Sequence, residues 1–162
     1  GRIGQATAKV AIGSGMNVIA YDPFIEEASL ELNFFDGQKL NFNIKTTSKN
    51  AVLKQSDFIT LHVPAQKEYV IGANEFEIMK DGVIIVNAAR GGVIDEVALI
   101  NSIETGKVAR AALDVFEKEP QPEVQLLMNP ALSLTPHTGA ATNEAQDRIG
   151  TELASQIITL LK

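Results

Sequence analysis

Short runs of apolar residues alternate with stretches of helical spacing along most of the chain. Residues 83–86 form an apolar run without polar alternation, which is typical of a strand buried on both faces of a parallel sheet. Similar runs predict further strands at residues 18–21, 58–63, 108–115 and 132–134. Because helical signals lie between these runs, the pattern predicts a doubly wound α/β fold with a parallel sheet.

The stretches between the predicted strands carry the helical signals. Apolar spacing and capping residues predict helices at residues 2–13, 25–32, 48–54, 75–79 and 96–104. Ser48 and Asp95 are expected to cap the helices near 48–54 and 96–104, and the short helix at 75–79 is expected to use Asn74 as its cap. Residues 33–43 are expected to form a loop, followed by a short strand near Ile44.

The last part of the sequence predicts one long helix. This helix should start at Thr142 or Asn143 and run to near Lys162. Its apolar residues recur at helical spacing, so they are expected to form a buried stripe. The residues of this stripe are Ile149, Leu153, Ile157, Ile158 and Leu161.

Polar residues cluster at the ends of the predicted strands, where the chain leaves the sheet. They are Asp22, His62, Arg90, Asp114 with Glu119, and His137. Ligands of open α/β sheets bind outside the carboxyl ends of the strands, so these side chains are expected at one rim. An arginine can hold both oxygens of a carboxylate, and a histidine beside an acid can move a proton. The set therefore predicts acid–base chemistry on a substrate that bears a carboxylate.

Each of these residues also has an interpretation without chemistry. Arg90 could cap a strand at the surface, Glu119 could be a solvated loop acid, and His137 could belong to a turn. His62 is expected to lie in an exit turn, and Glu117 and Lys118 are expected to lie in a solvated loop.

The first residues resemble the second half of a dinucleotide-binding G-x-G-x-x-G unit. Gly1 and Gly4 would be its middle and last glycines, and Asp22 follows at about the spacing of its ribose-binding acid. The amides of Arg2 and Ile3 would then meet a pyrophosphate at a helix N-terminus. A carboxylate at Asp22 repels a 2′-phosphate, which favours NAD over NADP. An ordinary helix start beside an aspartate that ends a strand remains the alternative.

Composition narrows the possible classes of protein. The chain has 162 residues, of which 45% are apolar, enough for a single domain with a full core over residues 1–162. The net charge of −6 argues against nucleic acid or a membrane surface as partner. The absence of cysteine excludes disulfides and thiolate chemistry and is compatible with a cytoplasmic location. We expect no metal site.

Six motifs in order along the sequence resemble the D-isomer-specific 2-hydroxyacid dehydrogenase family. They lie at residues 1–4, 22–23, 61–64, 87–92, 114–120 and 136–139, so the likeness spans nearly the whole chain. Within that family, residues 144–150 are most similar to the D-3-phosphoglycerate dehydrogenases. The resemblance implies a Rossmann-like domain and hydride transfer between NAD(H) and a D-2-hydroxyacid or 2-oxoacid. On this resemblance, 3-phosphoglycerate, an intermediate of serine biosynthesis, is one candidate substrate.

The resemblance also implies a role for each matching residue. Arg90 would hold the carboxylate and carbonyl of the substrate, and His137 would exchange a proton with the substrate oxygen. Glu119 would bind the other imidazole nitrogen and favour the imidazolium. The cofactor would be bound by Gly1, Arg2, Ile3, Gly4, Asp22, Val63, Pro64, Ala88, Ala89, Arg90, Asp114, His137 and Gly139.

The sequence departs from the family at its start. The first strand and opening glycine of the unit are not in it, and neither is the substrate domain that precedes the cofactor domain in this family. We therefore expect an N-terminally truncated NAD-binding domain that has an empty central slot in its sheet and does not turn over alone. A homodimer is expected, because relatives are usually dimers. A non-catalytic NAD(H)-sensing or corepressor-type module remains the alternative to a dehydrogenase.

Overall fold

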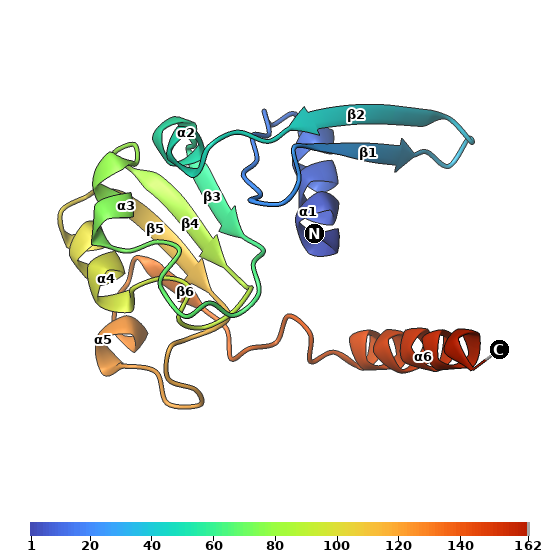
Figure 1. Cartoon of the computed structure of the whole chain (residues 1–162). Helices are drawn as coiled ribbons and strands as arrows, with labels where there is room; N and C mark the ends of the chain where they lie inside the picture. Colours follow the sequence, from blue (N-terminus) through green and yellow to red (C-terminus); the bar gives the residue numbers. More distant parts are fainter. Residues whose placement is uncertain (162) are drawn as a thin grey trace.

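A parallel β-sheet forms the centre of the structure (Figure 1). Within residues 1–161, which this computed structural model describes, the sheet has four strands in the order β3-β4-β5-β6. Its strands are β3 (Phe58–Leu61), β4 (Val83–Asn87), β5 (Val108–Leu113) and β6 (Leu132–Leu134). Each neighbouring pair is parallel. The predicted α/β fold with a parallel sheet is therefore confirmed, and its strands end at a common rim.

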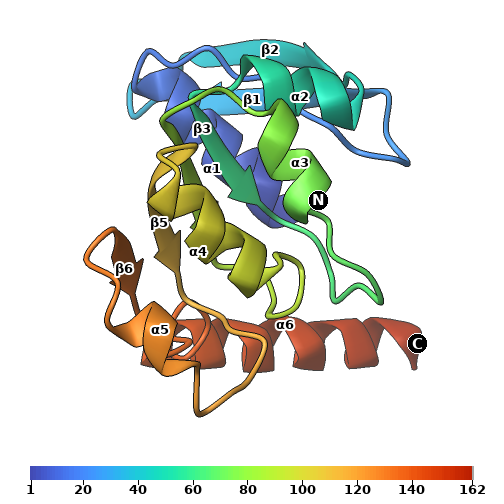
Figure 2. The ribbon, with the colours of Figure 1, turned by 90° about the vertical axis from the view of Figure 1, so that its left-hand side faces the viewer.

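Four helices that precede or follow the strands cover one face of the sheet. These helices are α2 (Lys49–Gln55), α3 (Ala73–Ile78), α4 (Glu96–Glu104) and α5 (Val124–Leu127), and Figure 2 shows them in front of the strands. Their apolar side chains and those of the strands form the core, which includes Leu53, Phe76, Ile85, Leu99, Val108, Leu113 and Leu126.

The helix starts show why these segments are helical. Ser48 and Asp95 cap α2 and α4 as predicted, because their side chains accept the amides of Ala51 and Ala98. The prediction of Asn74 as the cap of α3 is wrong. The cap position is Gly72, whose amide donates to the carboxylate of Glu75 at 3.0 Å.

The segment predicted as a helix at residues 25–32 is a strand. It forms β1 (Glu27–Asn33), which pairs antiparallel with β2 (Lys39–Lys45), where only a loop and a short strand were predicted. Ala28, Leu30 and Leu32 alternate with polar residues, so the period-two pattern prevails over the helical one. A turn with Gly37 at φ 85° closes this hairpin.

The strand predicted at residues 18–21 does not form. Ala20 makes a single bridge to Thr46 beside the hairpin and accepts a hydrogen bond from Thr47 at 2.8 Å. Within the described residues, the side of β3 away from β4 has no strand partner, as expected for a sheet that lacks its first strand. Without a strand beside β3, residues 18–21 have no sheet neighbour to pair with.

The two outer helices lie away from the sheet (Figure 1). They are α1 (Arg2–Gly13) and α6 (Asn143–Leu160). Helix α6 starts after a Thr142 cap, as predicted, but the expectation of a buried stripe is wrong. Ile149, Leu153 and Ile157 are 53%, 55% and 47% exposed, because α6 extends away from the core. A bidentate pair between Arg2 and Glu152 joins the two helices.

Candidate active site

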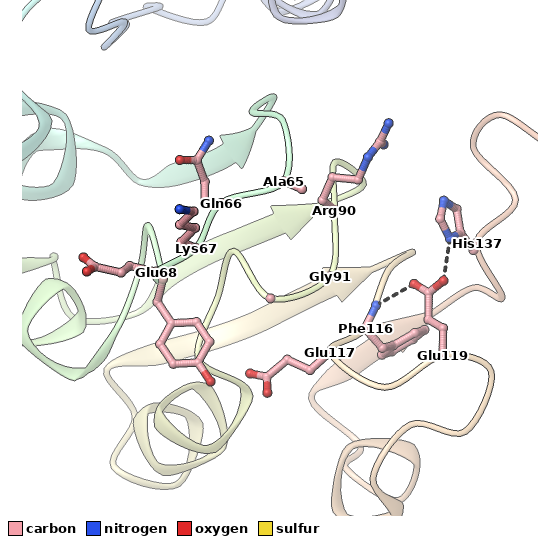
Figure 3. A pocket seen from close by; sticks show the side chains of 12 residues that line it. Ala65, Gln66, Lys67, Glu68, Arg90, Gly91, Phe116, Glu117, Glu119 and His137 are labelled. Atoms are coloured by element: carbon pink, nitrogen blue, oxygen red, sulfur yellow. Dashed lines mark hydrogen bonds and ion pairs between the residues drawn. The ribbon is translucent and has the colours of Figure 1, made fainter.

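A cavity of about 870 Å³ opens at the carboxyl rim of the sheet. The segments that follow β3, β4, β5 and β6 all contribute to its wall, so the strand ends bring distant parts of the chain together. Figure 3 shows the polar side chains that line it. The lining consists of residues 65–69, 90–92, Phe116, Glu117, Glu119 and His137.

His137 and Glu119 form a direct pair in this cavity. The Nδ1 atom of His137 lies 2.7 Å from Oε2 of Glu119, and Oε1 of Glu119 accepts the amide of Phe116 at 3.0 Å. The His137 bond, followed by the Phe116 amide, lowers the pKa of Glu119 below its ordinary range. An ionised carboxylate only accepts, so Nδ1 carries the proton and Nε2 faces away from Glu119.

The backbone places His137 for this contact. His137 has a positive φ of 54°, an uncommon conformation for a residue other than glycine. Its amide donates to the carbonyl of Thr135 at 3.1 Å, which closes a tight turn after β6. Such a local outlier at a rim is often a functional position.

Arg90 is held by a turn that Asn87 organises. The buried Asn87 side chain, 2% exposed, accepts the amide of Ala89 at 3.1 Å and donates to the carbonyl of Arg90 at 3.0 Å. The guanidinium of Arg90 donates to the carbonyl of Ala89 at 2.6 Å and lines the same cavity as His137. Asn87 was not singled out from the sequence, although a polar residue ending an apolar strand was a visible signal.

Asp114 fastens the turn that contains His137. Its carboxylate accepts the Thr135 hydroxyl at 2.5 Å and the amides of Thr138 and Gly139, both at 2.8 Å. Burial raises the pKa of Asp114, but these hydrogen bonds outweigh it, so the pKa lies below its ordinary value. A Cβ atom on Gly139 would lie 3.0 Å from this carboxylate, so the turn fits closely around it.

The start of α1 lies outside this cavity lining and offers backbone amides. The first helical hydrogen bond runs from the amide of Gln5 to the carbonyl of Gly1, so the preceding amides have no acceptor within the helix. Asp22 lies beside them, with Oδ2 3.9 Å from the nitrogen of Gly1. A Cβ atom on Gly4 would be 3.5 Å from His62, so α1 packs against the residue that follows β3. Free amides beside a carboxylate fit the diphosphate and ribose of a dinucleotide.

The remaining predicted cofactor residues lie near the rim or in the core. Val63 and Pro64 follow β3 and lead into the loop that lines the cavity. Ala88 is exposed beside Arg90, whereas Ala89 packs into the hydrophobic core. In the part of the chain that the structure describes, no group of three or more histidine, aspartate or glutamate side chains is arranged to hold a metal ion. No helix in that part combines the length and apolarity needed to cross a membrane.

The fold and the rim define a Rossmann-like nucleotide-binding domain. Residues 1–139 match the family described as D-isomer specific 2-hydroxyacid dehydrogenase, NAD binding domain. The chain therefore belongs to the D-isomer-specific 2-hydroxyacid dehydrogenase family, and the predictions of this family and of NAD as its cofactor are confirmed.

The chain spans less than half the length of three known proteins to which it is similar. It is 46% identical to a D-3-phosphoglycerate dehydrogenase of Archaeoglobus fulgidus, over all of this chain and 30% of that protein. It is 44% identical to a hydroxypyruvate reductase of Thermotoga maritima, over 97% of this chain and 49% of that protein. A solved glyoxylate reductase from Paecilomyes thermophila has a TM-score of 0.76 and 40% identity, over 93% of this chain and 44% of the other.

Proposed function

We propose that this chain is the cofactor-binding part of an NAD-dependent D-2-hydroxyacid dehydrogenase, with Arg90, Glu119 and His137 as its catalytic set. The observation that carries the proposal is the contact of 2.7 Å between His137 and Glu119 in the cavity that Arg90 also lines. Three groups from separate strand ends thus converge on one space. A cation that binds a carboxylate and an oriented imidazole are what the oxidation of a hydroxyacid requires.

Glu119 positions His137 and does not react itself. Its lowered pKa keeps it ionised at neutral pH, so it accepts from Nδ1 and leaves Nε2 to face the substrate oxygen. In the oxidation of an alcohol, Nε2 accepts the hydroxyl proton, and the charge of Glu119 stabilises the resulting imidazolium. In the reduction of a 2-oxoacid, the same nitrogen returns the proton to the carbonyl oxygen.

Arg90 orients the substrate. Its guanidinium can leave the carbonyl of Ala89 and bond both carboxylate oxygens of a hydroxyacid. The fixed turn around Asn87 limits the directions in which it can reach. The carbon that reacts is thereby held at a defined distance from His137.

NAD would be held at the start of α1, beside Asp22, and at the rim of the sheet. The amides of Arg2 and Ile3 would bind its diphosphate and Asp22 its ribose hydroxyls, while Ala88 and Gly139 would border the nicotinamide. NAD, when bound, supplies the hydride acceptor or donor.

The substrate class is a small D-2-hydroxyacid or 2-oxoacid. The relatives named above are a phosphoglycerate dehydrogenase, a hydroxypyruvate reductase and a glyoxylate reductase, and Arg90 suits the carboxylate that such compounds share. The greater identity to the first makes D-3-phosphoglycerate the substrate to test first, against D-lactate and D-glycerate, with the full-length protein.

Replacing His137 with alanine in the full-length protein tests the function. We expect turnover to fall by roughly a hundredfold or more, because proton transfer is lost, while the Kd for NAD stays within about twofold. Lys118→Ala, a change on the same exposed loop as Glu119, is the matched control and should keep normal turnover. Indifference of both turnover and NAD response to His137→Ala would point instead to an NAD(H)-sensing module without chemistry.

A further inference from the structure

Two glutamates join the loop that carries Glu119 to helix α4. The amide of Glu96 donates to Oε1 of Glu117 at 3.1 Å, and the amide of Glu117 donates to Oε1 of Glu96 at 2.7 Å. Each residue thus gives its amide to the other's carboxylate and accepts the other's amide. Reciprocal bonds of this kind fix both the distance and the orientation of the two backbones.

The clamped loop is also the one that holds the catalytic carboxylate. The amide of Phe116 donates to Glu119 at 3.0 Å, while the adjacent amide of Glu117 donates to Glu96. One peptide unit therefore separates the contact with α4 from the contact that orients Glu119. The two amides belong to consecutive peptide units that share the Cα atom of Phe116, so anchoring Glu117 limits how far the amide that holds Glu119 can move. Figure 3 shows Glu117 and Glu119 projecting from this one loop.

The same loop packs closely against the turn that carries Arg90. A Cβ atom on Gly91 would lie 1.8 Å from the carbonyl oxygen of Phe116, so only a glycine permits this approach. The position of the loop therefore sets the separation between the Arg90 turn and the pair of Glu119 and His137.

Burying the carboxyl group of Glu96 costs folding free energy. Glu96 is only 8% exposed. Burial raises the pKa of its carboxyl, and the charges of Glu117 and other nearby glutamates raise it further. The hydrogen bond from the Glu117 amide opposes this rise. Helix α4 does not need Glu96 as a cap, because Asp95 already accepts the amide of Ala98 at 2.9 Å. The buried carboxylate of Glu96 instead accepts the amide of Glu117 in the loop.

We infer that Glu96, through its reciprocal bonds with Glu117, is a positioning residue that holds the 116–119 loop where Glu119 can orient His137. This inference rests on the proposed dehydrogenase function for its kinetic consequence. Its geometric consequence, the state of the contact between Glu119 and His137, can be measured without any turnover.

The test compares Glu96→Ala with Glu96→Gln in the full-length protein. Glutamine keeps a side-chain oxygen that can accept the Glu117 amide, whereas alanine removes it. With Glu96→Ala we expect the downfield proton resonance of His137 Nδ1–H, assigned by its loss in His137→Ala, to broaden or move upfield. We expect kcat to fall about tenfold to a hundredfold with the Kd for NAD within about twofold, and Glu96→Gln to restore both readouts.

Glu117→Ala removes the other half of the clamp from an exposed position and should give the same losses, even if Glu96→Ala folds poorly. The double variant should lose no more than either single variant, because the two glutamates act as one unit. Lys118→Ala is the control on the same loop, since its side chain contacts Glu123 instead.

An unchanged His137 resonance and kcat in Glu96→Ala or Glu117→Ala would overturn the inference, as would a failure of Glu96→Gln to restore them. If the wild-type protein shows no dehydrogenase activity, the proposed function fails. The resonance still decides whether Glu96 positions the pair.

Discussion

At the scale of single residues, three carboxylates near the rim differ because their partners differ. Asp114 and Glu119 receive several hydrogen bonds, which lower the pKa of each. Glu96 receives one loop amide while buried beside other acids, so its pKa is raised. The direction of each shift follows from whether hydrogen bonding or desolvation dominates, and each direction has a measurable consequence.

Replacing Asp114 with asparagine should destabilise the fold. One carboxylate oxygen becomes an NH2 group that cannot accept from Thr138 or Gly139, and a lost hydrogen bond to a charged group costs about 1.5–3 kcal/mol. The stability that Asp114 adds is present above the ordinary aspartate pKa and is lost as pH falls through its lowered value. Urea unfolding at several pH values should therefore show the variant and wild type converging in acid. Asp57→Asn, an exposed pair with Lys80, is the control with little effect.

The pH dependence around Glu96 should have the opposite sign. Because its pKa is raised, the folded state holds the proton more tightly than the unfolded chain does. Wild-type stability, measured relative to Glu96→Gln, should fall as pH rises from the ordinary value of 4.5 through the raised pKa and then level off. Urea unfolding of both proteins between about pH 4 and about pH 7 tests this. A difference that stays constant with pH would contradict a desolvated carboxylate.

At the scale of elements, the apolar pattern of the sequence predicted the buried strands of the parallel sheet. The strands β3 to β6 and the caps at Ser48, Asp95 and Thr142 were predicted from the sequence, because burial on both faces and helix starts leave local signatures. The hairpin of β1 and β2 was not predicted. The segment at 25–32 satisfies a helical and an alternating pattern at once, and only pairing with residues 39–45 decides between them.

Among the long elements of the structure, helix α6 should have the least protection against hydrogen exchange. Its apolar stripe is exposed, and its side-chain link to α1 is a bidentate pair at the surface between Arg2 and Glu152. Surface pairs contribute little, so local opening of α6 should be much easier than opening of β4. Hydrogen exchange should therefore be faster in 143–160 than in 83–87. Equal protection would mean that the stripe is covered in solution.

At the scale of the whole molecule, the cavity is built from the segments that follow four strands, and it is open to solvent. Arg90 is exposed, and its guanidinium donates to the carbonyl of the neighbouring Ala89. A bound substrate and further protein around the cavity are needed to turn this guanidinium toward the substrate carboxylate. We predict that the chain of 162 residues oxidises D-2-hydroxyacids far more slowly than the full-length protein. Steady-state assays of both, at equal NAD saturation, measure this. Equal rates would show that residues 1–162 complete the site.

The sequence by itself determined the parallel sheet, the family and the identity of the polar residues at the rim, because each of these leaves a local pattern or a motif. It did not reveal that Asn87 builds the Arg90 turn or that Glu96 and Glu117 clamp the catalytic loop. Nor did it show that α6 leaves its stripe exposed. The contacts between Glu96 and Glu117 and the exposure of α6 depend on which segments become neighbours, and only the folded chain decides that. Hydrogen bonds between residues far apart in the sequence carry no signature in either partner alone.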